Sequence, residues 1–254
     1  MANQAGSLRI ALRSSDSSAF SILLSSAMLK FLLELDQRIT LFINGSDSLY
    51  WDDIVYLATQ TLTWIPVGLV LLFVVYREKG LRSLLLILGL ILLGILISDQ
   101  LSSSIVKPLT QRFRPAQDPY IMYFVDVVNE YRGGRYGFFS AHASNTFTVA
   151  TLLSLVFRHR LVALLLYSWA LLNCYTRIYL GVHYFGDITV GIIVGLLVGW
   201  GMYRLYVYFE QRTLRPRPGS DGLSHVYSEP LMQLLMASIL FTYCLLFIVP
   251  LFFI

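Results

Sequence analysis

Most of this chain consists of apolar segments that are long enough to cross a lipid bilayer. A membrane-spanning helix needs about 20 apolar residues; 56% of the 254 residues are hydrophobic and only 13% are charged. Because backbone polar groups cannot stay unpaired in hydrocarbon, such segments fold as helices. The sequence therefore predicts an all-α, polytopic transmembrane bundle of about six spans, over residues 54–76, 82–106, 142–158, 161–180, 185–208 and 231–254.

The segments outside these spans divide the chain into four parts. A polar, serine-rich tail leads into residues 18–44, where Phe31, Leu35 and Ile39 recur at helical spacing. This pattern favours an amphipathic helix in the membrane interface, with a further span as the alternative. We expect a tail and interfacial helix over 1–44, a membrane core over 45–209, a linker rich in proline and glycine over 210–230, and a C-terminal span over 231–254.

Three short polar clusters interrupt the apolar sequence. They are Lys107-x6-Arg114-Pro115, Phe139-Ser140-Ala141-His142 and Thr176-Arg177-x5-His183-x3-Asp187. Charged and imidazole side chains are costly beside membrane spans, so their presence indicates function. If the spans alternate in direction, all three clusters lie at the same membrane face, and the long loop 108–141 folds over the mouth of the bundle.

The opposite face carries a set of basic residues close to span ends: Arg77, Lys79, Arg82, Arg158, Arg160, Arg204, Arg212, Arg215 and Arg217. By the positive-inside rule that face is cytoplasmic, so the polar clusters are expected to face the periplasm. Arg112, Arg132 and Arg135 lie on the outer side and have no assigned role. The net charge of +4 is explained by loops and anion-binding residues, and we expect no nucleic-acid partner.

The third cluster contains a candidate nucleophile. His183 and Asp187 are four residues apart, which predicts that both project from one helix face. A carboxylate beside an imidazole holds one tautomer and stabilises the charged ring. His183 is thus a candidate nucleophile, and a structural His–Asp pair is the alternative. Ser140 and His142 precede a span whose first amide groups favour an anion, and His142 could protonate a leaving oxygen.

Three cations accompany these histidines. Lys107, Arg114 and Arg177 could each snorkel to lipid head groups when taken singly, but together with two histidines they favour a bound phosphate. The same charges oppose Zn²⁺ or Mg²⁺ at the histidines and Asp187, so we predict no metal and no cofactor. A lipid or anion transporter, the rival class, would carry charges at several depths of the bundle, whereas these gather at span ends.

A stripe of small residues follows the third cluster. Gly191, Gly195 and Gly199 continue the spacing of four that begins at His183 and Asp187. Small residues at this spacing allow membrane helices to approach closely. The stripe predicts that this helix docks against a neighbour.

In their order and internal spacing, the three clusters resemble the signature of the type 2 phosphatidic acid phosphatase family: K-x6-R-P, P-S-G-H and S-R-x5-H-x3-D. The motifs match over residues 107–187, and the pattern of spans extends the resemblance over most of 54–208. The resemblance implies a helical core like that of vanadium-dependent haloperoxidases and metal-free phosphate hydrolysis. It implies that His183 attacks phosphorus to form a phosphohistidine, that Asp187 orients it and that His142 protonates the leaving group. The implied phosphate-binding residues are Lys107, Arg114, Ser140, Ala141 and Arg177.

Three positions depart from the family pattern. Phe139, Ala141 and Thr176 stand where the family has Pro, Gly and Ser. Alanine tolerates a positive φ less well than glycine, so the change at 141 matters only if the site requires that conformation. Every catalytic side chain is present, which disfavours an inactive scaffold, and the apolar spans disfavour a haloperoxidase.

We therefore expect an integral-membrane, metal-independent lipid phosphatase in a bacterial cytoplasmic (inner) membrane, with its active site facing the periplasm. Its partners would be the bilayer and a membrane lipid phosphate. Undecaprenyl diphosphate and lipid A phosphates are the favoured substrates. Phosphatidylglycerol phosphate and phosphatidic acid are the alternatives.

Overall fold

The computed structural model of the chain describes residues 27–213 and 227–252, and its regular structure is helical apart from one isolated β-bridge between Phe113 and Tyr136. The prediction of an all-α fold is confirmed. The helices are residues 27–43, α2 (Leu49–Thr59), α3 (Thr61–Gln100), a π-helix (Leu101–Val106), α4 (Lys107–Thr110), α5 (Ala141–Phe157), α6 (Arg160–Tyr179), α7 (Phe185–Thr213) and α8 (Glu229–Ile248). Short 3₁₀ turns cover Pro115–Gln117, Val128–Glu130 and Val249–Phe252.

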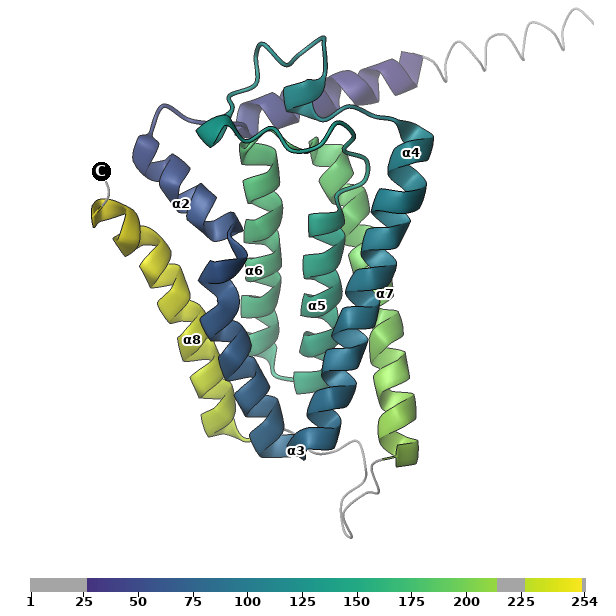
Figure 1. Ribbon diagram of the computed structural model, residues 1–254, viewed down its shortest axis with the longest axis vertical. Coiled ribbons are helices and arrows are strands. Elements are labelled where there is room, and N and C mark those ends of the chain that lie inside the picture. The colour runs from purple at the N-terminus through teal and green to yellow at the C-terminus, as the bar shows by residue number, and fades with distance from the viewer. Residues whose placement is uncertain (1–26, 214–226, 253–254) are drawn as a thin grey trace, which may run out of the picture.

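Four helical stretches in the described part of the chain are long and apolar enough to cross a membrane: Thr61–Thr110, Arg160–Tyr179, Phe185–Arg212 and Glu229–Phe252. The first stretch reverses direction at Gly80, whose φ of +80° is strained for any residue with a side chain (Figure 1). Helix α5 is a shorter apolar helix in the middle of the bundle. The count of six crossings stays a prediction.

The predicted span over 54–76 is wrong as one continuous helix. Gln60 has an extended conformation, with ψ of 131°, and separates α2 from α3. The break is stabilised because two side chains of α3 bond carbonyls at the end of α2. The Thr63 hydroxyl donates to Leu57 O at 2.8 Å and the Trp64 indole to Ala58 O at 2.9 Å. Leu57 O also accepts the Gln60 N–H at 3.0 Å, whereas Ala58 O would otherwise lack a helical partner.

Helix α7 packs against α5 along the glycine stripe, which confirms the predicted docking. A Cβ atom at Gly195 would lie 2.5 Å from the Ser144 carbonyl oxygen, and one at Gly191 would lie 2.7 Å from the Ser140 carbonyl oxygen. The Thr148 hydroxyl also donates to the Gly195 carbonyl at 3.3 Å. The two backbones therefore approach too closely for any larger side chain. This contact joins α5, which begins within the second cluster, to α7, whose first turn contains Asp187 of the third cluster.

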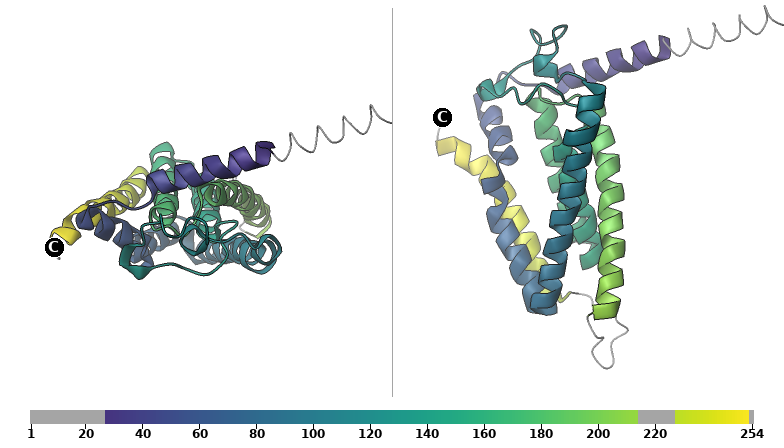
Figure 2. Two further views of the ribbon diagram at one scale, coloured as in Figure 1. Left: turned by 90° about the horizontal axis from the view of Figure 1, so that it is seen from above. Right: turned by 45° about the vertical axis from the view of Figure 1, so that its right-hand side comes forward.

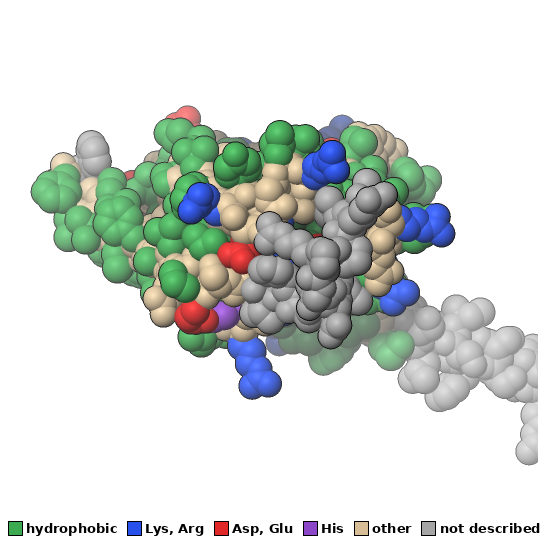
Figure 3. Space-filling view, turned by 90° about the horizontal axis from the view of Figure 1, so that it is seen from below, with side chains coloured by type: hydrophobic (Ala, Val, Ile, Leu, Met, Phe, Trp, Pro, Cys, Tyr) green, Lys and Arg blue, Asp and Glu red, His purple; other side chains and the backbone are tan. Residues whose placement is uncertain are grey.

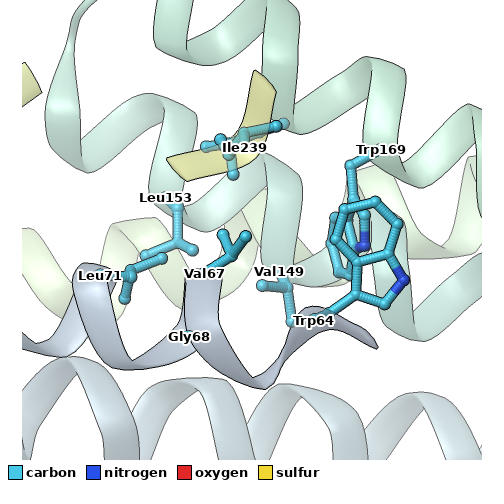
Figure 4. A pocket seen from close by; sticks show the side chains of 9 residues that line it. Trp64, Val67, Gly68, Leu71, Val149, Leu153, Trp169 and Ile239 are labelled. Atoms are coloured by element: carbon cyan, nitrogen blue, oxygen red, sulfur yellow. The ribbon is translucent and has the colours of Figure 1, made fainter. Parts of the chain in front are cut away.

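The core between α3, α5, α6 and α8 contains an apolar cavity of about 130 Å³. Figure 4 shows Trp64 and Trp169 at one end of this cavity and Leu71, Leu153 and Ile239 toward the other. The two indole rings make an edge-to-face contact, with centroids 6.0 Å apart. The cavity lies below the polar end of the bundle, among side chains that bear no charge.

The N-terminal helix, residues 27–43, crosses the end of the bundle instead of running parallel to it (Figures 1 and 2). Several of its apolar side chains are exposed, among them Phe31 at 62% and Phe42 at 90%. Its position in a membrane interface stays a prediction, and the part of residues 18–44 before residue 27 lies outside the described residues. Beside it, the loop 111–140 covers the same end of the bundle, as predicted.

Lysine and arginine side chains surround the other end of the molecule (Figure 3). One of them, Lys79, pairs with the nearly buried Glu210 at 3.2 Å. Arg215, Arg217 and most of the predicted linker 210–230 lie outside the described residues.

Candidate active site

The turn between α6 and α7 positions the candidate nucleophile. Gly181 has a φ of +64° and ends α6 in a Schellman motif: Gly181 N donates to Ile178 O at 2.9 Å, and Val182 N donates to Arg177 O at 3.1 Å. A Cβ atom at Gly181 would lie 2.4 Å from the Val125 side chain, so both conformation and space require glycine. The motif turns the chain sharply and places His183 two residues later.

His183 and Asp187 form a buried pair. His183 Nδ1 lies 3.3 Å from Asp187 Oδ2, and the residues are 2% and 0% exposed. The prediction that both lie on one helix is wrong in detail, because α7 begins at Phe185 and His183 precedes it. The first turn of α7 nevertheless brings the carboxylate back to the ring, and the same oxygen accepts the Tyr184 N–H at 3.1 Å.

The protonation of His183 follows from its surroundings. Burial lowers the pKa of His183 to about 4, because the charged ring loses its hydration; Asp187 opposes this shift, and the cations Arg114 and Lys107 add to it. The imidazole is therefore neutral at pH 7. Nδ1 of the ring is paired with Asp187, and Nε2 has no hydrogen-bond partner in the described part of the chain. A neutral ring with a free Nε2 can act as a nucleophile.

The second cluster begins α5 beside this pair. Ser140 is the N-cap of α5, where its hydroxyl accepts the Ala143 N–H at 3.3 Å, and its own N–H donates to Asp187 O at 3.1 Å. Ala141 is the first residue of α5 and has no positive φ, so its replacement of glycine causes no strain. The side chain of His142 is exposed, in contrast to that of His183.

The predicted cations converge on the histidines. Lys107 and Arg114 interact electrostatically with both histidines, and Arg177 interacts with His142. Arg114 is fixed by hydrogen bonds to Tyr136 O at 3.2 Å and Val182 O at 3.3 Å. The structure thus brings all the predicted site residues to one end of the bundle.

The other two cations, Arg177 and Lys107, lie in distinctive local structure. Arg177 is only 3% exposed, and its Nε lies 3.4 Å from the Thr176 hydroxyl, so the threonine supplies the oxygen that a serine would. Lys107 directly follows the π-helix Leu101–Val106, a wide helical form that is frequent at functional sites. Within it, the Ser102 hydroxyl donates to Phe139 O at 2.7 Å and so attaches the second cluster to this helix.

Sequence reasoning missed two residues of the site. Arg112 Nη1 donates to Asp187 Oδ1 at 2.8 Å, and its Nη2 donates to Asp36 Oδ2 at 2.5 Å. Asp36 Oδ1 also accepts the Gly186 N–H at 2.7 Å, across 150 residues of sequence. The two carboxylates outweigh burial and raise the pKa of Arg112, and its guanidinium stacks 4.1 Å from the centre of the Tyr184 ring. The N-terminal helix therefore contributes a carboxylate to the site.

The remaining loop arginines have structural contacts. Arg132 Nη1 donates to Ala116 O at 3.1 Å, and the Arg135 guanidinium lies 5.2 Å from the Phe113 ring centre. Both help to fold the loop that covers the site. Across residues 27–213 and 227–252, His, Cys, Asp and Glu side chains form no group of three or more that could hold a metal ion.

The chain is similar in sequence to proteins of one known family. A model of the PAP2 superfamily matches residues 86–211. A lipid A 4'-phosphatase of Porphyromonas gingivalis is 39% identical over 186 residues, which cover 73% of this chain and 79% of that protein. The chain belongs to the PAP2 superfamily. A second lipid A 4'-phosphatase, of Bacteroides thetaiotaomicron, is 37% identical over 196 residues, or 76% of this chain and 84% of that protein.

Two solved structures share the fold of this PAP2 protein. The crystal structure of Aquifex aeolicus LpxE matches with a TM-score of 0.50 and 22% identity, over 67% of this chain and 95% of that one. A PAP2-type phosphatidylglycerolphosphate phosphatase of Bacillus subtilis matches with a TM-score of 0.52 and 19% identity, over 73% and 89%. The predicted PAP2-type helical fold and the predicted class of enzyme, a membrane-bound lipid phosphatase, are confirmed.

Proposed function

We propose that this PAP2 phosphatase removes a phosphate from lipid A through a phosphohistidine at His183. The buried, neutral His183 beside Asp187, among fixed cations, is the observation that carries the chemistry. The substrate is proposed because both similar curated proteins are lipid A 4'-phosphatases. The 4'-phosphate is accordingly the group that we expect to be released.

In the first step, His183 Nε2 attacks phosphorus and the bond between phosphorus and the lipid oxygen breaks. The ring acquires a positive charge, which Asp187 stabilises through Nδ1–H. His142, at the exposed mouth of the site, takes up a proton when the phosphate anion binds beside it and donates that proton to the departing oxygen. The dephosphorylated lipid leaves and the phosphoryl group stays on Nε2.

In the second step, water attacks the phosphohistidine. His142, now neutral, accepts a proton from the water, and the N–P bond breaks to release inorganic phosphate. His183 returns to its neutral form, so the cycle consumes one water and one phosphate ester. No step requires a metal, because Lys107, Arg114 and Arg177 supply the positive charge that stabilises the phosphoryl oxygens.

Backbone groups complete the proposed phosphate site. Ala141 and His142 are the first two residues of α5, where the helix dipole favours an anion, whereas the next two N–H groups already donate to Ser140. Ser140 already uses its hydroxyl as an N-cap acceptor, and its O–H remains available to donate to a phosphoryl oxygen.

The decisive experiment is phosphate release from pure lipid phosphates in detergent. We expect lipid A to be hydrolysed faster than undecaprenyl diphosphate, phosphatidylglycerol phosphate or phosphatidic acid. His183→Ala should lose turnover, whereas His142→Ala should accumulate ³²P-labelled enzyme when given a substrate with a good leaving group. Full activity in His183→Ala would rule out the mechanism, and no release from lipid A would rule out the substrate.

We also propose that the site faces the periplasm, because the opposite end of the bundle carries the basic residues near span ends. The test is labelling of single cysteines in a variant lacking Cys174 and Cys244. A cysteine at Gly134, which has open space around it, should react with an impermeant thiol reagent in intact spheroplasts. A cysteine at the exposed Arg82 should react only after lysis. The reverse pattern would place the site in the cytoplasm.

A further inference from the structure

A polar pocket of about 300 Å³ adjoins the candidate phosphate site. It is lined by Tyr56, Thr59, Gln60, Tyr131 and Arg177. Three of these residues come from the last turn of α2 and the break that follows it, one comes from the loop that covers the bundle, and Arg177 comes from the third cluster. The pocket therefore begins at a proposed phosphate-binding side chain and extends toward the helix break.

The lining supplies aromatic rings and neutral hydrogen-bonding groups. Tyr56 is 36% and Tyr131 is 40% exposed, so both rings present surface. The hydroxyl oxygen of Thr59 is buried and has no hydrogen-bond partner in the part of the chain that the structure describes. A buried polar atom without a partner is costly, which indicates that a bound group or water satisfies it. The Gln60 side chain, at the helix break, can both donate and accept.

The charges of the pocket exclude a second phosphate as its occupant. Among the described residues that line it, Arg177 is the only charged one, and we have assigned it to the phosphoryl group that reacts. A diphosphate would require further cations to match its second anionic group. Neutral hydroxyl and amide groups beside aromatic faces suit a neutral, hydroxyl-rich ligand instead.

The surroundings of the pocket match an amphiphile. Trp64 follows Gln60 by four residues, at the start of α3, and lines the apolar cavity described above (Figure 4). Polar groups thus lie at the same end as the candidate phosphate site, and apolar groups lie deeper in the bundle. A lipid whose head group carries the reacting phosphate would place that head group among the polar residues and its apolar part toward the deeper, apolar residues.

We infer that the pocket formed by Tyr56, Thr59, Gln60 and Tyr131 binds the saccharide to which the reacting phosphate is attached. This inference rests on the proposed function and adds a subsite to it. The sugar hydroxyls would bond to Thr59 and Gln60, while a tyrosine ring covers an apolar face of the sugar. Recognition of the saccharide would separate a phosphorylated glycolipid from glycerol-based lipid phosphates.

The test uses the full-length protein in detergent and two variants of the lining, Gln60→Ala and Tyr56→Ala. Neither residue is a proposed catalytic or phosphate-binding group. Tyr123→Ala is the matched control, because Tyr123 is 82% exposed on the loop and does not line the pocket. Three quantities are measured: kcat/KM on lipid A, the inhibition constant of vanadate, and the inhibition constant of phosphatidic acid, which has a phosphate and acyl chains but no sugar.

We expect each lining variant to lower kcat/KM on lipid A by about tenfold, which is the effect of losing one or two hydrogen bonds. Both inhibition constants should stay within about twofold of the wild-type values. Neither inhibitor has a sugar, so the loss of sugar binding should leave the binding of their phosphate or vanadate group unchanged. Tyr123→Ala should match the wild type throughout. This pattern would assign the pocket to the saccharide.

Two results would overturn the inference. If the inhibition constants rise together with the loss on lipid A, the lining acts through Arg177 or through the fold. If kcat/KM on lipid A does not change, the pocket takes no part in recognition. A wild-type enzyme that cleaves phosphatidic acid but not lipid A would instead refute the proposed function, and the inference would fall with it.

Discussion

The ion pairs that join Asp36, Arg112 and Asp187 lead to a prediction about the N-terminal helix. Asp36 accepts two hydrogen bonds, one from Arg112 at 2.5 Å and one from Gly186 N at 2.7 Å. Arg112 in turn bonds the carboxylate that holds His183. We expect Asp36→Asn to lower kcat, because the shape is retained while the charge that orients Arg112 is lost.

The size of the effect follows from the burial of these groups. The side chains of Asp36 and Arg112 are 13% and 23% exposed, so water screens their pair only in part. Hydrogen bonds to charged groups contribute about 1.5–3 kcal/mol, and asparagine keeps one of the two acceptor contacts. A loss of about 1.5–2 kcal/mol at the transition state corresponds to a decrease in kcat of about 10- to 30-fold.

The assay is steady-state phosphate release, with kcat and KM determined separately. KM should change little, since Asp36 contacts Arg112 and Gly186 and not the residues proposed to bind phosphate. The matched control is Glu34→Gln on the same helix, because Glu34 forms only an exposed pair with Lys30 at 3.9 Å. Thermal unfolding of each variant in detergent separates a loss of folded protein from a loss of turnover.

A double-mutant cycle tests the route of the effect. If Asp36 acts through Arg112, then Asp36→Asn combined with Arg112→Gln should cost no more kcat than Arg112→Gln alone. Additive losses would show that Asp36 acts independently of Arg112. A value of kcat for Asp36→Asn within about twofold of the wild type would refute the reasoning, since an effect below 0.5 kcal/mol is too small for a charged contact.

Four further predictions follow from the site and the helix packing. Because burial lowers the pKa of His183 to about 4, the ring is neutral above that pH, and the acidic limb of kcat/KM should lie near pH 4; a limb near 6.5 would contradict this. Arg177→Lys should reduce kcat/KM by about 10- to 100-fold, because an ammonium cannot make the two-pronged contact of a guanidinium. Activity should survive EDTA, and a loss that Mg²⁺ or Zn²⁺ restores would overturn the metal-free mechanism. Gly195→Leu should lower the melting temperature in detergent, with a cost of about 1–3 kcal/mol from overpacking, whereas Gly201→Leu, with open space around it, should not.

Local sequence patterns were sufficient to predict much of this site. The motif spacings indicated His183, Asp187, His142 and the cations, because each motif is a short segment of chain whose residues stay close in space even where a turn separates two helices, as between Arg177 and Asp187. The glycine stripe indicated helix docking for the same reason. The roles of these residues remain proposals, since the geometry shows that they meet and not what they do.

Long-range contacts were beyond the reach of such patterns. Asp36 lies 150 residues before Gly186, on a helix whose apolar side chains suggested only a membrane interface. No local pattern indicates a role for Arg112, because its partners Asp36 and Asp187 come from two distant helices. The break at Gln60 was also missed, since the apolar pattern continues through it, and the bonds from Thr63 and Trp64 that stabilise the break depend on side-chain geometry.

The contact between α5 and α7 also limits how this sequence can change over evolution. At Gly191, Gly195 and Gly199, an added Cβ atom would meet carbonyl oxygens of α5 at 2.5–2.7 Å. The contacted atoms belong to the backbone, which a substitution does not remove. A second mutation on α5 therefore cannot make room for a larger residue on α7. These positions should therefore stay glycine while lipid-facing neighbours on α7 drift freely. Their persistence in distant homologues would mark the helix pair that carries both histidine motifs.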